Sequence, residues 1–276
     1  MIVEARGVRL YVNGTFDPGE TDRPPLIFLH GFTLSGREWA PLLSRYAPDF
    51  QPLAPDLIGH GASEAPEDEH HYTMEACTSQ ILEVLQTLEI PPAFWAGYSM
   101  GGRVLLSLAL REPSVVRAMV LESTTAGIAE PKERQARLRR DAGMAQFIER
   151  HPIETFVDRW TAHPIFRSQS GVAPVKREYI RNIRLQNSRI GLANSLRGMG
   201  RGAMPYLWTA LPMIDIPTLL LAGELDADHV KIAERMDHLL PECQMHIAEG
   251  AGHNIHFERP DLFFDITRAF FNSQIV

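Results

Sequence analysis

The chain has 276 residues, of which 45% are hydrophobic, and carries a formal net charge of −7 at pH 7. This length suits one large domain or a core domain with an insertion, and the negative charge argues against a nucleic-acid partner. No apolar run approaches the ~18 residues of a membrane-spanning helix, so we expect no membrane partner. The first residues lack the basic start and apolar middle of a signal peptide, and the two cysteines match no metal-ligand spacing. We therefore expect a cytoplasmic protein.

Short apolar runs alternate with helical patterns along most of the chain. We expect strands at residues 8–12, 26–30, 51–56, 93–96, 115–121, 216–222 and 243–248, and helices at 73–88, 102–110, 229–239 and 260–272. Thr73 is a candidate cap for the first of these helices. This alternation predicts an α/β fold, with a mostly parallel central sheet covered by helices on both faces.

Residues 131–210 interrupt this alternation. They contain no convincing strand, and prolines divide them into short helices, at Pro152, Pro164, Pro174 and Pro205. We predict a helical cap insertion at 131–210, carried by a core domain that comprises residues 1–130 and 211–276. The insertion holds 15 Lys and Arg against 6 Asp and Glu, whereas the rest of the chain holds 12 and 28. A basic segment in an acidic protein indicates an anionic partner, although a solvated, arginine-rich helical face would look the same.

A serine lies between two glycines where a predicted strand gives way to a helix, in Gly97-Tyr98-Ser99-Met100-Gly101. The backbone turns sharply at such a nucleophile elbow, so a side chain at either glycine would clash. The serine is held in a strained conformation with its hydroxyl exposed. This motif makes Ser99 a candidate catalytic residue.

A serine hydroxyl needs a histidine to take its proton and a carboxylate to orient that histidine. In this architecture the order along the chain is serine, acid, histidine, each in a loop after a strand. Asp226 and His253 follow the last two predicted strands, so we expect a Ser99–Asp226–His253 triad. Asp228 competes for the role of the acid, and we favour Asp226.

The run His30-Gly31-Phe32 follows an early strand, where this fold builds half of its oxyanion hole. The backbone N–H groups of Phe32 and Met100 would donate hydrogen bonds to a developing oxyanion. We expect His30 to be structural. His60, in a tight turn after residues 51–56, is not expected to be catalytic.

Together these features resemble the α/β-hydrolase fold along the whole chain. Several motifs narrow the resemblance: Arg103 four residues past the serine, Ala136-Arg137-Leu138-Arg139-Arg140-Asp141, Phe156-Val157-Asp158-Arg159-Trp160, Pro164-Ile165-Phe166, Ser195-Leu196-Arg197-Gly198-Met199-Gly200 and Pro205-Tyr206-Leu207-Trp208. Jointly they are similar to the 2-succinyl-6-hydroxy-2,4-cyclohexadiene-1-carboxylate (SHCHC) synthase family of the menaquinone pathway. The chain departs from that family after Asp226, where Asp228 and His229 stand in place of a frequent lysine and aromatic residue.

The resemblance implies a carbon–oxygen lyase rather than a hydrolase. The family eliminates pyruvate from 2-succinyl-5-enolpyruvyl-6-hydroxy-3-cyclohexene-1-carboxylate, a small substrate with three carboxylates, and uses neither a metal nor another cofactor. The residues matching the family's substrate contacts are three arginines and three aromatic residues: Arg103, Arg137, Arg184, Tyr98, Trp160 and Phe166. Nearby arginines compete with Arg137 and Arg184 for this role, namely Arg139, Arg140, Arg181 and Arg189. Nothing in the sequence sets an oligomeric state.

Two alternatives use the same fold. One is a serine hydrolase of esters or of carbon–carbon bonds, and the other is a ligand-binding protein that keeps the triad without catalysis. Ser99 excludes the enzymes of this fold that use an aspartate nucleophile. The arginines favour a multiply anionic ligand in every case.

Overall fold

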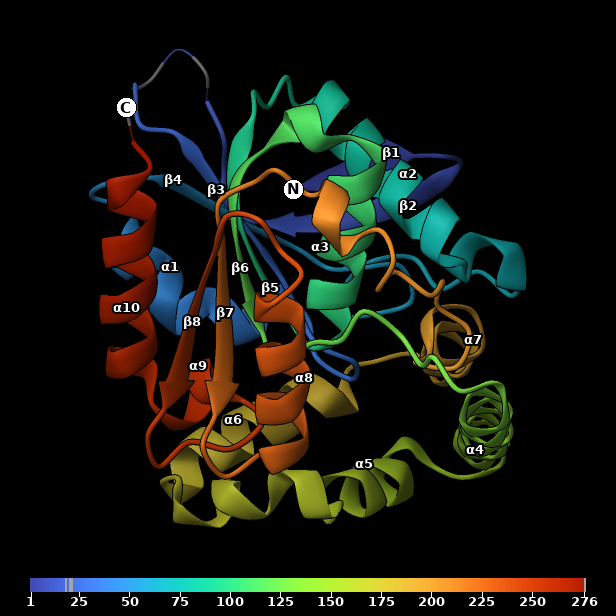
Figure 1. Cartoon of the computed structure of the whole chain (residues 1–276). Coiled ribbons are helices and arrows are strands. Elements are labelled where there is room, and N and C mark those ends of the chain that lie inside the picture. The colour runs from blue at the N-terminus through green and yellow to red at the C-terminus, as the bar shows by residue number, and fades with distance from the viewer. Residues whose placement is uncertain (18, 20–21, 276) are drawn as a thin grey trace.

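The computed structural model describes residues 1–17, 19 and 22–275, and an eight-stranded sheet runs through its centre (Figure 1). The strands lie in the order β1-β2-β4-β3-β5-β6-β7-β8. Their bounds are β1 Ile2–Ala5, β2 Val8–Asn13, β3 Pro25–Leu29, β4 Gln51–Pro55, β5 Ala93–Tyr98, β6 Val116–Glu122, β7 Thr218–Gly223 and β8 Cys243–Ala248. Strands β3 to β8 all run parallel, as predicted, whereas β2 runs antiparallel to both of its neighbours, β1 and β4.

Helices cover both faces of this sheet, because alternate strand residues point to opposite sides and both sets are apolar. One face packs against α2 (Met74–Thr87), α3 (Met100–Arg111) and α8 (Ala227–Asp237). The other face packs against α1 (Ala40–Tyr46) and α10 (Pro260–Ser273). The predicted α/β fold is therefore confirmed.

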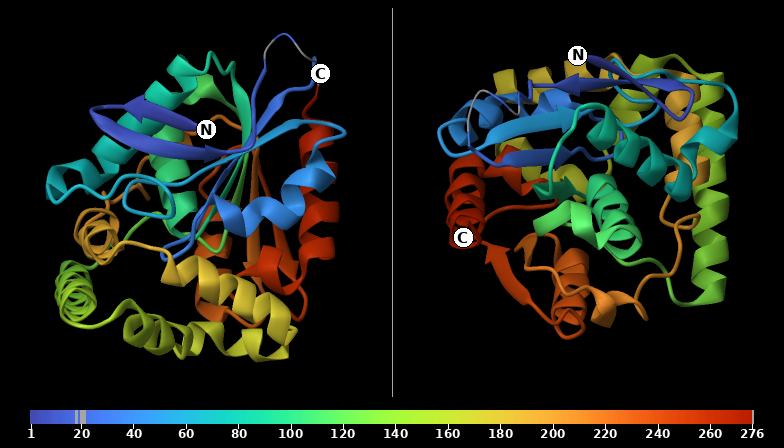
Figure 2. Two further views of the ribbon diagram at one scale, coloured as in Figure 1. Left: turned by 180° about the vertical axis from the view of Figure 1, so that it is seen from behind. Right: turned by 90° about the horizontal axis from the view of Figure 1, so that it is seen from above.

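Residues 131–210 form helices and no strand among the residues that the structure describes. Their elements are α4 (Pro131–Arg150), α5 (Ile153–Thr161), the 3₁₀ helix η4 (Pro164–Gly171), α6 (Pro174–Leu185) and α7 (Arg189–Met199). These helices lie beyond the carboxyl ends of the parallel strands (Figures 1 and 2). Seven buried residues from α4, α5 and α7 form an apolar cluster of their own. The division into a core domain and a cap at these boundaries stays a prediction.

Side-chain caps mark the starts of helices α2 and α8. The Thr73 hydroxyl caps α2 by accepting a hydrogen bond from the N–H of Ala76 at 3.1 Å. Helix α8 starts two residues earlier than expected, since Asp226 occupies its N-cap and accepts from the N–H of His229. No helix in the described part of the chain is long and apolar enough to cross a membrane.

Candidate active site

Ser99 lies at the junction of β5 and α3 in a backbone conformation that few non-glycine residues adopt, with φ of +49°. The turn is tight on both sides. A Cβ atom at Gly97 would lie 2.8 Å from the carbonyl oxygen of Gly101, and one at Gly101 would collide with the backbone of Leu29. Strain of this kind costs on the order of 1–3 kcal/mol and persists where the surrounding structure enforces it. The elbow leaves the Ser99 hydroxyl half-buried at the carboxyl edge of the sheet.

The structure brings Ser99, Asp226 and His253 together from three separate loops. Nδ1–H of His253 donates to Oδ2 of Asp226 at 2.6 Å, and Nε2 of His253 faces Oγ of Ser99 at 3.1 Å. Because a carboxylate can only accept, Asp226 fixes the tautomer that leaves Nε2 free to take the hydroxyl proton. Asp228 is exposed and makes no such contact among the described residues. The geometry thus favours Asp226 over Asp228 as the acid.

Burial and neighbouring charges shift the pKa values of His253 and Asp226. Burial lowers the pKa of His253, and its contact with Asp226 offsets only part of that effect. Burial alone would raise the pKa of Asp226, but the imidazoles of His229 and His253 outweigh it and hold that pKa well below its usual range. At pH 7 the triad therefore contains a neutral imidazole and an ionised carboxylate.

Phe32 and Met100, whose backbone N–H groups are the predicted oxyanion hole, follow β3 and begin α3. Met100 is the first residue of α3, where N–H groups have no partner within the helix. Phe32 follows β3, in a loop held by a hydrogen bond from the N–H of Gly31 to Oε1 of Glu38 at 3.1 Å. Phe32, Ser99 and Met100 line one cavity of about 1110 Å³.

Most of the predicted substrate contacts line this same cavity. They are Tyr98, Arg103, Arg137, Trp160 and Phe166. The exposed fraction of Tyr98 is 3%, and that of Phe166 is 8%. Residues from 131–210 and residues from the loops after the strands therefore line one space together with Ser99.

Three guanidinium groups in this cavity, those of Arg103, Arg137 and Arg201, interact with the carboxylate of Asp141. Arg103 is only 6% exposed and donates from Nη1 to the carbonyl oxygen of Met199 at 2.7 Å. Arg137 donates from Nε to Oδ1 of Asp141 at 2.8 Å. Arg201 lines the same cavity, and its buried Nε has no hydrogen-bond partner in the described part of the chain. Burial, followed by repulsion from Arg137 and Arg201, lowers the pKa of Arg103 to about 9. With Arg140 and Arg159, five arginines line the cavity against three aspartates, Asp141, Asp226 and Asp228, so the lining is short of negative charge.

Sequence reasoning missed Arg201. It follows the Leu-Arg-Gly-Met-Gly run directly and stands in a short Gly-Arg-Gly turn. An arginine between two glycines after a helix belongs to no helical or strand repeat, so the sequence does not indicate which way its side chain points. Its membership of a locally basic segment is the only signal that the sequence offers.

Arg184 does not line the cavity that contains Ser99. Its guanidinium lies in a neighbouring cavity of about 560 Å³, where Nη1 donates to Oγ1 of Thr161 at 3.0 Å. The Cζ atom of Arg184 stands 5.0 Å from the centre of the Phe166 ring, and Phe166 lines both cavities. Phe166 therefore separates Arg184 from the serine. The role of Arg184 as a substrate contact stays a prediction.

His30 and His60 are buried, and the imidazole of each contacts backbone atoms. Nε2 of His30 accepts from the N–H of Leu57 at 2.9 Å, and Nδ1 of His60 lies 3.0 Å from the carbonyl oxygen of Ile58. Burial lowers the pKa of His30 to about 4 and that of His60 to about 3. Both imidazoles are therefore neutral at pH 7.

A buried Glu–His–Glu network supports the loops around the triad. Nδ1 of His256 lies 2.7 Å from Oε2 of Glu122, and Nε2 lies 3.0 Å from Oε2 of Glu38. Glu122 also accepts from the N–H of His256, while Glu38 accepts from Gly31 in the predicted oxyanion loop. The network thereby ties the loop after β3 to the segment that follows His253.

We expect this network to make the folded protein less stable as the pH rises above neutral. Burial alone would lower the pKa of His256, but Glu122 and Glu38 raise it from 6.5 to about 9. The folded protein thus keeps a proton that the unfolded chain releases, so the free energy of unfolding should fall as the pH rises from 6.5 to about 9. Urea denaturation across this range measures the slope. The variant His256→Gln should lose most of it, and an equal slope in both proteins would contradict the assignment.

Comparisons with known proteins agree with this fold and site. A family model described as alpha/beta hydrolase fold matches residues 24–260. A thermophilic esterase from Thermogutta terrifontis, solved with malate bound, superposes with a TM-score of 0.85 at 23% identity and covers 100% of this chain and 99% of its own. At that identity the likeness concerns the fold alone. The chain is thus an α/β-hydrolase-fold protein.

More similar relatives define a narrower group. A protein of Bacillus subtilis (strain 168), provisionally named 2-succinyl-6-hydroxy-2,4-cyclohexadiene-1-carboxylate synthase, is 39% identical over 272 residues, which cover 99% of this chain and 98% of the relative. The synthase of that name from Serratia proteamaculans (strain 568) is 32% identical over 89% of this chain and 92% of its own. A structure of MenH from S. aureus superposes with a TM-score of 0.90 at 31% identity, over 96% and 98% of the two chains. The chain belongs to the SHCHC synthase family.

Proposed function

We propose that this protein eliminates pyruvate from 2-succinyl-5-enolpyruvyl-6-hydroxy-3-cyclohexene-1-carboxylate and leaves the cyclohexadiene product. The observation that carries the proposal is the group formed by Arg103, Arg137 and Arg201, which lines one cavity with Ser99 and interacts with the carboxylate of Asp141. More arginines than aspartates line this cavity, and the substrate brings three carboxylates of the opposite charge. Arginine suits that task because its guanidinium stays charged and binds carboxylates through two parallel hydrogen bonds.

His253 supplies the base in this mechanism. Its Nε2 takes the Ser99 proton, and the pair removes the ring proton next to the succinyl ketone. Negative charge then develops on the ketone oxygen, where the N–H groups of Phe32 and Met100 stabilise it. Re-formation of the ketone drives the electron pair into the ring, where a new double bond forms, the existing double bond shifts by one position and the bond to the enolpyruvyl oxygen breaks. The leaving enolate gains a proton and becomes pyruvate.

Aromatic side chains complete the cavity. The Trp160 ring packs edge-on against Phe32 at 5.2 Å between centroids, and Phe166 packs similarly against His253 at 6.3 Å. They present apolar surface to the substrate ring and reduce access of water to the triad. Low water content strengthens both the arginine contacts and the oxyanion contacts.

The proposed base predicts the acidic limb of the pH–rate profile. His253 must be neutral to accept a proton, and burial lowers its pKa below 6.5. The value of kcat/KM should therefore be independent of pH just above 6.5 and should fall only as the pH drops through that lowered pKa. Initial rates of pyruvate release in buffers of constant ionic strength provide the measurement. An acidic limb centred above 6.5 would argue against His253 as the free base.

Elimination also predicts that Ser99 carries no covalent intermediate. In an ester or carbon–carbon hydrolase the same serine would hold an acyl group during turnover. Mass spectrometry of the intact protein, quenched while pyruvate is being released, should show the unmodified mass. An adduct on Ser99 that forms and decays as fast as turnover would refute the elimination mechanism and favour the hydrolase alternative.

The proposal includes a cytoplasmic location. Both cysteines, Cys77 and Cys243, are free, as is usual where thiols are kept reduced.

A further inference from the structure

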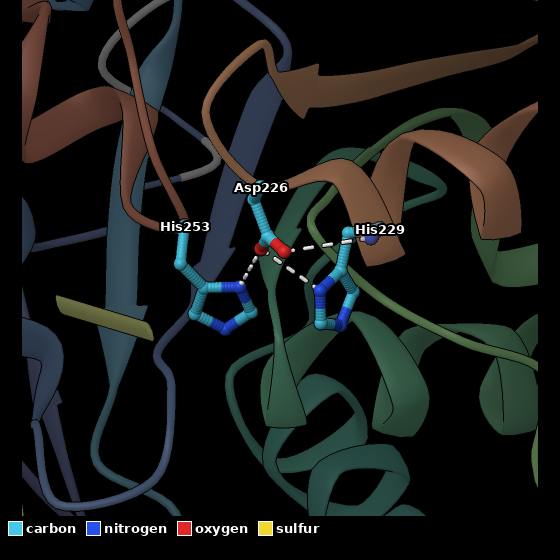
Figure 3. Close-up of side chains that lie close together, drawn as sticks. All are labelled: Asp226, His229 and His253. Atoms are coloured by element: carbon cyan, nitrogen blue, oxygen red, sulfur yellow. Dashed lines mark hydrogen bonds and ion pairs between the residues drawn. The ribbon is translucent and has the colours of Figure 1, made fainter. Parts of the chain in front are cut away.

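A second histidine shares the carboxylate of the triad. Oδ2 of Asp226 lies 2.6 Å from Nδ1 of His253 and 2.8 Å from Nδ1 of His229 (Figure 3). The ligand atoms of the three residues all lie within 4.8 Å of one another. His229 and His253 are each 5% exposed, and Asp226 is 9% exposed. These side chains offer a compact set of two nitrogens and one oxygen, and all three residues line the cavity.

The Nδ1 atom of His229 has no satisfactory partner. It approaches Oδ2 of Asp226 closely, but the two groups are not aligned for a hydrogen bond, and Nδ1 is a buried atom without a hydrogen-bond partner in the described part of the chain. Leaving such an atom unpaired is unfavourable, because burial has removed its hydrogen bonds to water and nothing replaces them. A cation between the two imidazoles and the carboxylate would remove this cost.

We propose that Asp226, His229 and His253 form a site for a divalent transition-metal ion, best suited to Zn²⁺, and that the bound ion inhibits the enzyme. The inhibitory role depends on the proposed function of the triad, whereas the binding does not. Two imidazoles and a carboxylate are a donor set that Zn²⁺ prefers, and a fourth position would remain for water. With metal–ligand bonds of about 2.0–2.2 Å, each Nδ1 would move roughly half to three-quarters of an ångström away from Oδ2.

Coordination would block catalysis by changing the tautomer of His253. A metal on Nδ1 displaces the proton that this atom donates to Asp226, and the neutral imidazole then carries its proton on Nε2. Nε2 faces Oγ of Ser99 at 3.1 Å, so it would become a donor there and would no longer accept the serine proton. The number of protons on the imidazole stays the same, but the base is lost.

Nearby charged side chains have opposing effects on cation binding at this site. Arg201 lies close enough to interact with Asp226 and Asp228, and it opposes a second positive charge. Asp228 is exposed on the rim of the same cavity and attracts the ion. Mg²⁺ and Ca²⁺ bind oxygen ligands in preference to imidazole, so we expect neither to occupy the site.

The test combines inhibition with direct binding. Pyruvate release is measured in buffers that hold free Zn²⁺ at nanomolar to micromolar concentrations. The proteins are the wild type, His229→Asn, His229→Gln and a control, His238→Asn. The control changes an exposed histidine just past the end of α8. Each rate is divided by the zinc-free rate of the same protein. Wild type and control should be inhibited alike, and chelator should restore the rate. The His229 variants should need at least about tenfold more Zn²⁺, since one of three ligands is missing.

Binding is measured without catalysis on Ser99→Ala protein, with and without His229→Asn or His229→Gln. Zn²⁺ should raise the melting temperature only where His229 is present, because an ion that binds the folded state alone stabilises it. Melting curves without zinc show that each variant folds. Equal zinc responses with and without His229 would overturn the site. If zinc stabilises only proteins with His229 but no pyruvate is released, the proposed function fails while the metal site stands. Binding without inhibition would overturn the inhibitory role.

Discussion

Ser99→Ala and His253→Ala should each lower the turnover of pyruvate elimination by at least about 10²-fold, because acid–base assistance is typically worth 10²–10⁴-fold. Nε2 of His253 lies 3.1 Å from Oγ of Ser99, so removing either side chain breaks the proposed path of the proton. Steady-state rates of pyruvate release from the purified variants give the measurement.

Folding has to be checked in the same experiment. Both residues line the cavity rather than the apolar clusters of the core, so the circular dichroism spectrum and melting temperature should stay close to those of the wild type. Near-wild-type turnover in either folded variant would remove that residue from the mechanism.

Loss of a cavity arginine should produce the second largest effect. Hydrogen bonds between charged groups are worth roughly 1.5–3 kcal/mol, so Arg103→Ala, Arg137→Ala and Arg201→Ala should each lower kcat/KM by at least about tenfold. Lysine at these positions should restore only part of the loss, because an ammonium cannot reproduce the planar fork of a guanidinium. Any residual activity on a neutral ester should change little, which separates weaker substrate binding from misfolding.

Two further variants sharpen this test. Arg139→Ala removes an exposed arginine of α4 that lies outside the set of residues lining the cavity, so its kcat/KM should match the wild type. The value of kcat/KM for Arg184→Ala tests whether the substrate extends past Phe166 into the neighbouring cavity, because only then should the value fall. If Arg103, Arg137 and Arg201 can all be replaced without loss, the basic insertion is a solvated face and the hydrolase alternative takes precedence.

The elements that carry the triad were predictable because their signals are local. Glycines at 97 and 101 mark the elbow, and the loops after two apolar strands hold Asp226 and His253. The strand Ile2–Ala5 was missed, although its alternate residues are buried, because it is short and pairs only with its hairpin partner β2. Helix α1 was missed for a similar reason, since seven residues are too few to display a helical period.

The substrate contacts were harder to predict, because they depend on how the helices of residues 131–210 pack over the sheet. Arg184 matches a family position in the sequence, yet the Phe166 ring stands between its guanidinium and the serine cavity. Arg201 has no sequence motif of its own and reaches the cavity only because of the turn after α7. His229 is a departure from the family in the sequence, but its contact with Asp226 depends on the three-dimensional fold.

Side-by-side assays of the purified protein on the enolpyruvyl substrate and on a p-nitrophenyl ester test the central claim most directly. We predict one pyruvate released for each substrate consumed, little or no ester hydrolysis, and loss of pyruvate release in Ser99→Ala. Rapid hydrolysis of the ester with no pyruvate released would contradict the claim and assign the triad to a hydrolase. Activity on neither substrate would contradict it as well, and would leave a ligand-binding protein of the same fold.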